Sequence, residues 1–146
     1  MKFSSFFAKF PELIETEFRN ITILDNSFYK HIPPGNYAFS ELFCADPDCD
    51  CRNVFIRIIS NDFPTPWAVL RYGWESKKFY CDWMGAEDRF AKAMSGISLD
   101  TQSPYNEMSK EFLELFTDMI KNDALYAKRI QTHYRMFKEV VDKQHR

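Results

Sequence analysis

The sequence predicts an α+β fold: an antiparallel β-meander of about three to five strands over residues 18–83, packed against a C-terminal helical hairpin over 104–121 and 123–142. Alternating runs of β-branched and aromatic residues, separated by short turns, fill the first part. Apolar residues at helical spacing fill the last part, which has no glycine after Gly96 and no proline after Pro104. No linker or repeat interrupts the chain, so we expect a single domain over residues 1–146.

The N-terminal residues carry a helical pattern, because Phe3, Phe6, Phe7 and Phe10 are spaced i, i+3, i+4 and i+7. We expect this segment to dock on the core. A membrane-surface anchor is the weaker alternative, since the segment is short and carries few charges. Pro11 is expected to open a further helical turn.

Strand patterns follow the N-terminal segment. They cover residues 18–24, 36–44, 53–60, 67–74 and 78–83. Turn signals at Pro33-Pro34-Gly35 and at residues 61–66 separate them. Sequential strands with short connections favour antiparallel pairing.

Helical patterns fill the rest of the chain. Residues 87–94 are predicted as a helix with Gly96 at its C-terminal cap. Ser103 and Pro104 are expected to open the first helix of the hairpin. Asp123 is the expected N-cap of the last helix. One face of that helix carries Tyr126, Ile130, His133, Tyr134, Phe137 and Val140.

Composition excludes several functions. The chain holds 15 Phe, 7 Tyr and 3 Trp but only 4 Gly, so it can bury a large core. The glycines are too scattered for a GxGxxG, Walker A or GxSxG motif, and HExxH is absent. A net charge of −2 makes nucleic acid an unexpected partner, with the basic last helix as a minority option.

Hydropathy indicates no membrane association. No run of 18 apolar residues occurs, so no membrane-spanning helix is expected. The first residues lack the unbroken apolar region of a signal peptide, and we expect a cytoplasmic protein.

Three of the four cysteines, Cys44, Cys49 and Cys51, lie in one short segment between two predicted strands. In a reducing compartment, clustered thiols indicate a metal site or redox chemistry more often than disulfides. Tetrahedral Zn²⁺ takes thiolate ligands, and we expect it to bind here. Packing of small thiols in a turn is the alternative. Redox chemistry is another, although its usual CxxC spacing is absent.

The aspartates of this segment do not form a calcium loop. Asp46, Asp48 and Asp50 match positions 1, 3 and 5 of an EF-hand. However, Cys51 and Arg57 then occupy the positions that require glycine and glutamate.

A tetrahedral site needs a fourth ligand, for which the sequence offers two main candidates. His133 is preferred, because an imidazole on an apolar helix face needs a partner. Cys81, the remaining thiol, is the alternative, and His31 and His145 are weaker candidates.

These patterns predict a small soluble zinc-binding domain with a structural metal site and no assigned catalytic residue. A structural role is expected because several thiolates make zinc a poorer Lewis acid and the deaminase pattern is missing. The partner is expected to be a protein, bound through an aromatic groove at residues 72–75 and 79–85 or through the basic helix. The alternative is a metal- or thiol-dependent enzyme acting on a small molecule in an aromatic-lined cleft.

Overall fold

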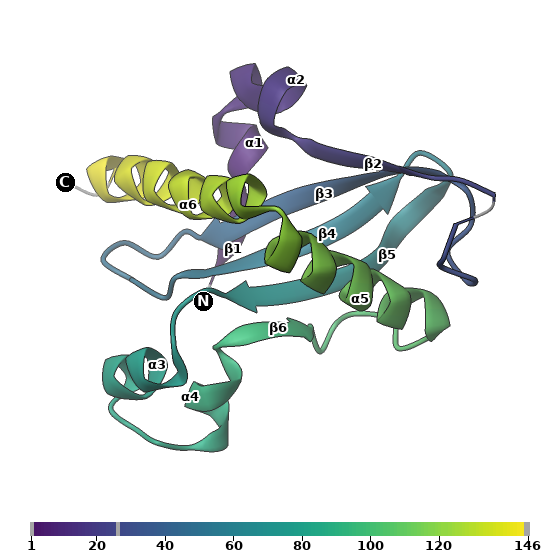
Figure 1. The fold of residues 1–146 in the computed structure, drawn as a ribbon. Helices are drawn as coiled ribbons and strands as arrows, with labels where there is room; N and C mark the ends of the chain where they lie inside the picture. Colours follow the sequence, from purple (N-terminus) through teal and green to yellow (C-terminus); the bar gives the residue numbers. More distant parts are fainter. Residues whose placement is uncertain (1, 26, 145–146) are drawn as a thin grey trace.

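The computed structural model describes residues 2–25 and 27–144. Its strands are β1 Phe3–Ser5, β2 Arg19–Ile23, β3 Gly35–Cys44, β4 Asn53–Ser60, β5 Phe63–Gly73 and β6 Gly96–Leu99. Its helices are α1 Phe6–Lys9, η1 Pro11–Leu13, α2 Ile14–Glu17, α3 Lys77–Met84, α4 Arg89–Ala93, α5 Glu107–Asn122 and α6 Ala124–Gln144. The arrangement confirms the predicted α+β class, with an antiparallel sheet packed against two C-terminal helices (Figure 1).

The sheet runs in the order β1-β3-β4-β5-β6, and β2 also pairs with β3. β1 and β2 share one edge of β3, because β1 pairs with residues 42–44 and β2 with residues 35–39. The short helices α1, η1 and α2 lie between these two edge strands along the chain. The N-terminal segment is therefore tied to the sheet at two places.

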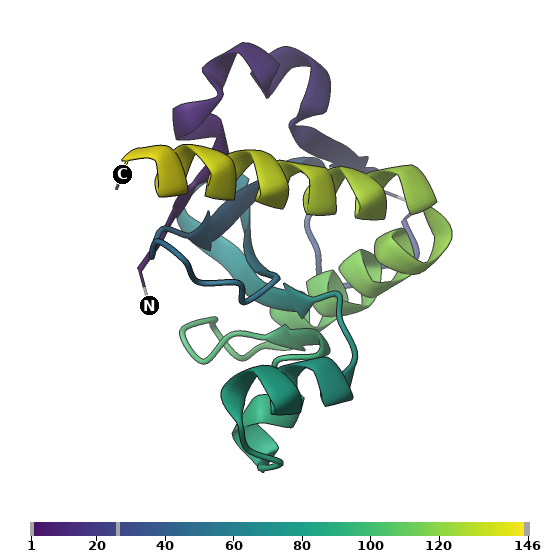
Figure 2. The same cartoon turned by 90° about the vertical axis from the view of Figure 1, so that its left-hand side faces the viewer.

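Helices α5 and α6 cover one face of the sheet (Figures 1 and 2). That face carries the buried alternate residues of three neighbouring strands, including Tyr37, Phe39 and Phe43 of β3. The main core that they form with the two helices also contains Val54, Ile56, Ile58, Leu70, Phe112, Phe116, Ile130 and Phe137. Burial of this many aromatic and branched side chains accounts for the docking of both helices.

Residues 78–83, predicted as a strand, belong to helix α3, so this prediction is wrong. Ser76 caps the helix by accepting the backbone N–H of Phe79, and Gly85 ends it in the left-handed conformation. These caps outweigh the strand-like alternation of aromatic residues. The strand that pairs with β5 on its other side is β6, which the sequence pattern did not reveal because it has only four residues.

Three predicted boundaries also differ. Phe3 lies in a strand rather than in a helix, because β1 pairs with the end of β3. Gly96 begins β6 instead of capping α4. Helix α5 begins after Asn106, whose side chain forms a capping box with Ser109, and not at Pro104.

The N-cap of the last helix is as predicted. The Asp123 side chain accepts the backbone N–H of Tyr126 at 3.1 Å. No helix within residues 2–25 and 27–144 is long and apolar enough to cross a membrane.

Gly73, the last residue of β5, marks the closest approach between the sheet and the α3–α4 segment. A Cβ atom there would lie 1.9 Å from the carbonyl oxygen of Met94 and 2.7 Å from the hydroxyl of Tyr80. The carbonyl belongs to the backbone and cannot swing aside as a flexible side chain would. Glycine is therefore required where the sheet meets this segment.

We predict that Gly73→Ala lowers the free energy of unfolding by about 3 kcal/mol, through overpacking against backbone. Urea denaturation measures the change. Gly85→Ala is the matched control: no atom would crowd its Cβ, although its φ is +68°, so it should cost only about 1 kcal/mol. Equal losses in the two variants would contradict this interpretation of Gly73.

Candidate metal centre

The connection between β3 and β4 brings three thiols together. Cys44 is the last residue of β3, Cys51 precedes β4, and Cys49 lies between them. Their sulfur atoms all lie within 4.8 Å of one another. Cys44 and Cys51 are fully buried and Cys49 is partly buried. The structure thus places the three predicted cysteine ligands in one cluster that could hold a metal ion.

The connection folds back on itself. The carbonyl of Asp46 accepts the backbone N–H of Cys49 at 3.4 Å. Asp48 and Arg52 have positive φ angles of 62° and 44°, which non-glycine residues seldom adopt. Contacts from two neighbouring helices hold the chain in this conformation.

Helix α6 holds the first half of the connection. The Lys138 ammonium donates to the carbonyls of Cys44 at 3.2 Å and Asp46 at 2.6 Å. The Asp142 carboxylate accepts the backbone N–H of Asp48 at 3.2 Å. Lys138 is only 8% exposed, so this cation of α6 is buried against the connection.

Two tyrosines hold the second half, around Arg52. The Tyr134 hydroxyl of α6 accepts the Arg52 backbone N–H at 3.2 Å and donates to Asp50 at 3.0 Å. The Tyr80 hydroxyl of α3 donates to the Arg52 carbonyl at 2.8 Å. The strained backbone at Arg52 therefore has both of its polar groups satisfied.

The Arg52 side chain adds charge pairs next to the thiols. Its guanidinium lies 2.8 Å from Asp50 and 3.4 Å from Glu75, and stacks 4.4 Å above the ring of Phe79. Glu75 thus contacts an arginine rather than another carboxylate. The Lys138 ammonium, in contrast, contributes to lowering the pKa of Cys44 and so favours a bound thiolate.

A second, small core lies beneath the cluster. Cys44 and Cys51 pack there with Tyr80 and Met94, and Phe3 and Phe79 border them. At residues 72–75 and 79–85, where an aromatic groove was expected, several rings are packed inside the protein. Tyr72 and Tyr80 are buried, and Trp74 packs against Tyr134 at 5.1 Å between ring centroids.

The three thiols share their protons unequally. The hydrogen bond from Cys51 lowers the pKa of Cys44 to about 6. The same hydrogen bond raises the pKa of Cys51, and burial raises the pKa of Cys49. One sulfur is therefore a thiolate near neutral pH, and the thiolate is the form that binds metals.

The cluster fits a tetrahedral, thiophilic ion. With Zn–S bonds of about 2.3 Å, the sulfurs of a tetrahedral site lie about 3.8 Å apart, and the three sulfurs fall within 4.8 Å. One Asp46 carboxylate oxygen lies 3.7 Å from the Cys44 sulfur. Asp46 nevertheless lies outside the group of ligand atoms that are all within 4.8 Å of one another, which contains only the three cysteines.

The structure does not bring His133 to the cysteines. Its Nδ1 lies 2.7 Å from Glu41 and its Nε2 lies 2.9 Å from Glu17, so both ring nitrogens are occupied. The ring stacks on Phe6 with centroids 3.9 Å apart. The physical reason is the direction of the side chains around α6. Tyr134, Lys138 and Asp142 are spaced four residues apart, so they share the helix face that contacts the connection. The His133 side chain points about 100° away from that of Tyr134 and meets Glu41 of β3 instead.

The other candidates also lie outside the cluster. Cys81 is buried on α3 but is not part of the group of close ligand atoms found within the described residues. His31 lies in the β2–β3 connection, with Nδ1 3.5 Å from Glu111. His145 lies outside the residues that the structure describes.

The buried pair of His133 and Glu41 holds protons tightly. Burial disfavours the charged imidazole, but the hydrogen bonds to Glu41 and Glu17 outweigh it and raise the pKa of His133. Burial raises the pKa of Glu41, and its bond to His133 only partly opposes this. The burial of Glu41 could be inferred from the sequence, because it alternates with Tyr37, Phe39 and Phe43 on one face of β3.

Comparisons with protein-family models, with curated protein sequences and with solved structures give no significant match.

We predict that Glu17→Gln destabilises the protein by about 1–2 kcal/mol between the usual pKa values of glutamate and histidine, about 4.3 and 6.5, because it removes a charge-assisted hydrogen bond to the protonated imidazole of His133. A raised folded-state pKa contributes stability below the unfolded value of about 6.5 and loses it as pH rises through the folded value. The difference between wild type and variant should therefore shrink above pH 6.5. Urea denaturation at several pH values measures it.

Glu15→Gln, an exposed change on the same short helix, is the control and should have little effect at any pH. Two results would contradict the assignment of a charge-assisted hydrogen bond between Glu17 and His133. One is a loss of stability in Glu17→Gln that stays constant with pH, and the other is the same loss in Glu15→Gln.

Proposed function

We propose that the chain is a small interaction domain in which a structural Zn²⁺, held by Cys44, Cys49 and Cys51, fixes the β3–β4 connection. The observation that carries this proposal is the convergence of the three sulfur atoms within 4.8 Å of one another. When bound, the ion would cross-link the ends of two neighbouring strands through its thiolate ligands. The residues of α6 and α3 already hold the same connection from both sides.

The Asp46 carboxylate is the fourth ligand in this proposal. One carboxylate oxygen lies 3.7 Å from the Cys44 sulfur, close to the roughly 3.6 Å between ligands of a tetrahedral zinc site. The side chain has to turn towards the other two sulfurs to bind, because Asp46 lies outside the group of close ligand atoms. This replaces the earlier expectation of His133, whose ring nitrogens bind Glu41 and Glu17. Lys138, which donates to the Asp46 carbonyl, orients the residue.

A structural role is supported over a catalytic one by the position of the thiols. Two of the three are fully buried. Cys49 borders a shallow hollow of about 340 Å³ between the connection and α6, lined otherwise by charged residues and Tyr134. The larger hollow on the other face of the sheet has no cysteine in its lining, so an enzyme that brings a thiol or metal to a cleft is the less supported alternative.

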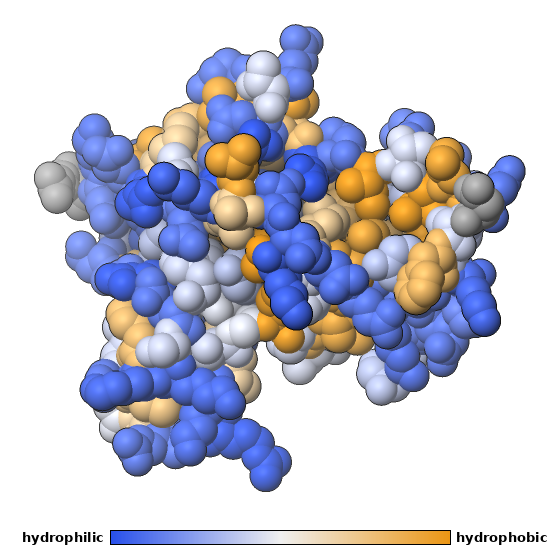
Figure 3. Space-filling model, viewed as in Figure 1, coloured by the Kyte–Doolittle hydropathy of each residue, from blue (hydrophilic) through white to orange (hydrophobic). Residues whose placement is uncertain are grey.

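The protein-binding half of the proposal is supported by exposed apolar side chains. Leu24 and Phe28, in the β2–β3 connection, are 62% and 86% exposed. Figure 3 shows apolar surface on the side of the molecule where this connection lies. Exposed apolar patches of this kind mark protein-interaction sites in soluble domains.

We predict that a chelator raises amide hydrogen exchange in residues 45–52 of the wild-type protein, because the connection loses its cross-link. Cys51→Ser and Asp46→Ala should bind zinc at least tenfold more weakly than wild type. Cys81→Ser is the matched control and should retain wild-type zinc affinity. Hydrogen-exchange mass spectrometry and zinc titration with a competing chelator dye make the measurements.

Two results would refute the metal assignment. One is an exchange increase spread evenly over the chain rather than confined to the connection. The other is zinc affinity that falls in Cys81→Ser but not in Cys51→Ser.

For the partner, we expect the immobilised wild-type chain to retain a binding protein. We predict that the Phe28→Ser variant, immobilised in the same way, no longer retains it. The variant removes a side chain that is 86% exposed and packs edge-on against the partly buried Tyr29, so its stability should stay within about 0.5 kcal/mol of wild type. Cross-linking mass spectrometry of the captured complex shows whether the partner contacts residues near Phe28. Capture that Phe28→Ser leaves unchanged would rule out this surface.

A further inference from the structure

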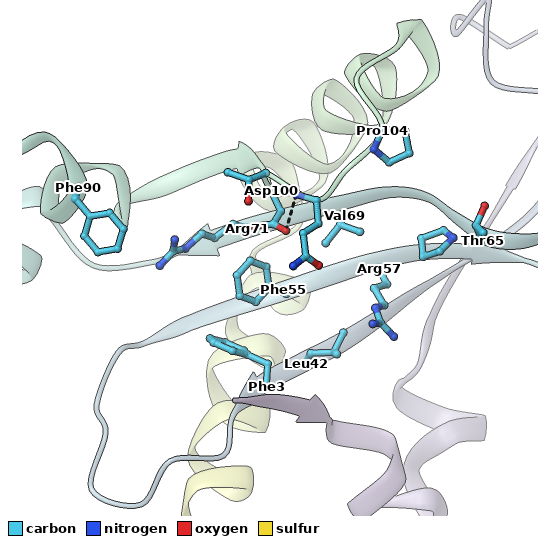
Figure 4. Close-up of a pocket in the computed structure, with 13 residues that line it drawn as sticks. Phe3, Leu42, Phe55, Arg57, Thr65, Val69, Arg71, Phe90, Asp100 and Pro104 are labelled. Atoms are coloured by element: carbon cyan, nitrogen blue, oxygen red, sulfur yellow. Dashed lines mark hydrogen bonds between the residues drawn. The ribbon is translucent and has the colours of Figure 1, made fainter. Parts of the chain in front are cut away.

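The face of the sheet opposite α5 and α6 is hollowed. A cavity of about 860 Å³ lies over β3, β4 and β5, between the N-terminal strand and the segment that follows β6 (Figure 4). Its size falls within the range of sites for small organic ligands. No residue of the cysteine cluster lines it.

Two arginines and two apolar residues form the floor of this hollow. Arg71 of β5 lies opposite Phe55 of β4, and Arg57 of β4 lies opposite Val69 of β5. Residues two apart on a strand point to the same face, so the four side chains share the open face. The guanidiniums occupy one diagonal of this square and the apolar side chains the other (Figure 4).

The positive charge of these arginines is not neutralised by the protein. Within the described residues, neither Arg57 nor Arg71 forms a salt bridge. The Arg71 Nε donates to Asn53 at 3.0 Å, and its guanidinium lies 5.6 Å from the centroid of the Phe55 ring. By contrast, Arg19 and Arg52, also next to the sheet, are paired with Asp123 and Asp50.

One acidic residue, Asp100, also lines the hollow, so the lining carries two positive charges and one negative charge. The Asp100 carboxylate accepts the backbone N–H of Gln102 at 3.1 Å, and thereby shapes the rim of the hollow (Figure 4). Its own backbone N–H donates to the carbonyl of Val69 at 2.9 Å. The free guanidinium N–H groups remain available for an anionic group from outside, which they bind in bidentate fashion.

The remaining walls are apolar and come from separate parts of the chain. Phe3 packs edge-on against Phe55 with ring centroids 4.6 Å apart. Phe90 of α4, which is 59% exposed, lies at the end of the hollow near Arg71 (Figure 4). Leu42, Pro66 and Pro104 complete the apolar lining. Planar apolar surface beside unpaired guanidiniums suits a ligand that is apolar at one end and anionic at the other.

We infer that the open face of the sheet binds an organic anion with a planar apolar body, whose carboxylate or phosphate group is held by Arg57 and Arg71. The apolar body lies against Phe3, Phe55 and Phe90. This site shares Phe3 with the small core beneath the cysteines, but no thiol and no residue near Phe28 lines it. Its test through Arg57, Arg71 and Phe55 therefore does not depend on either earlier proposal.

The test uses two fluorescent dyes of nearly the same shape. Anilinonaphthalene sulfonate carries a negative charge, and phenylnaphthylamine lacks it. We expect wild type to bind one sulfonate dye per chain, and Arg57→Gln and Arg71→Gln each to weaken that binding about tenfold. Neither variant should change the affinity for the neutral dye by more than twofold. Phe55→Leu should weaken both dyes.

The control for net charge is Lys128→Gln, which removes an exposed cation from α6 on the other side of the sheet. It should leave the affinities for both dyes unchanged.

Competition by benzoate and by phenyl phosphate distinguishes a carboxylate from a phosphate ligand. The anion that the site prefers displaces the sulfonate dye at the lower concentration. Amide chemical shifts of the wild-type protein locate the bound dye, and the shifts should fall in β4 and β5. Unchanged sulfonate affinity in both arginine variants, or shifts confined to another part of the molecule, would overturn the proposal.

Discussion

The packing of α6 along β3 is the contact on which the rest of the structure depends. In the middle of the helix, His133 binds the buried carboxylate of Glu41 from β3 at 2.7 Å. Towards its C-terminus, Lys138 reaches the carbonyls of Cys44 and Asp46, just where β3 ends. One helix thus places a charge pair in the core and holds the cysteine connection. A shift of the helix by one turn, about 5.4 Å, would break both sets of contacts.

The same sheet carries two chemically different faces. Residues of β3 and β4 that point towards α5 and α6 are almost all apolar and buried, with Glu41 as the exception that His133 neutralises. Residues of the opposite face include Arg57 and Arg71 with apolar neighbours. Since side chains alternate along a strand, the segments that complete the core also set the spacing of the arginines. The thiols lie at the end of these strands, where the two faces meet a second small core.

The sequence was sufficient to predict the features that depend on a local pattern of residues. Alternation located β3, β4 and β5, and Asp123 marked the start of α6. The crowding of Cys44, Cys49 and Cys51 in one short connection indicated their proximity, because a loop that folds back must bring its ends together. Features that depend on competition between local signals were not predictable. In residues 77–84, two caps overcame a strand-like alternation, and β6 is too short to carry a pattern of its own.

Contacts between residues far apart in the chain could not be predicted from the sequence either. His133 lies on the apolar face of α6 as predicted, but whether it meets a thiol or a carboxylate depends on which part of β3 it faces. Glu17, its second partner, is 116 positions away along the chain. The arginine pair on the open face likewise required the strand register, which places Arg57 and Arg71 across from apolar residues.

The central claim is that the three thiols hold one metal ion in the folded protein. Elemental analysis of the purified wild-type chain, with protein concentration from amino-acid analysis, tests it most directly. The account predicts about one zinc per chain, retained through gel filtration in metal-free buffer. A chain that is fully folded with no bound metal, and that neither takes up added zinc nor gains stability from it, would contradict the account.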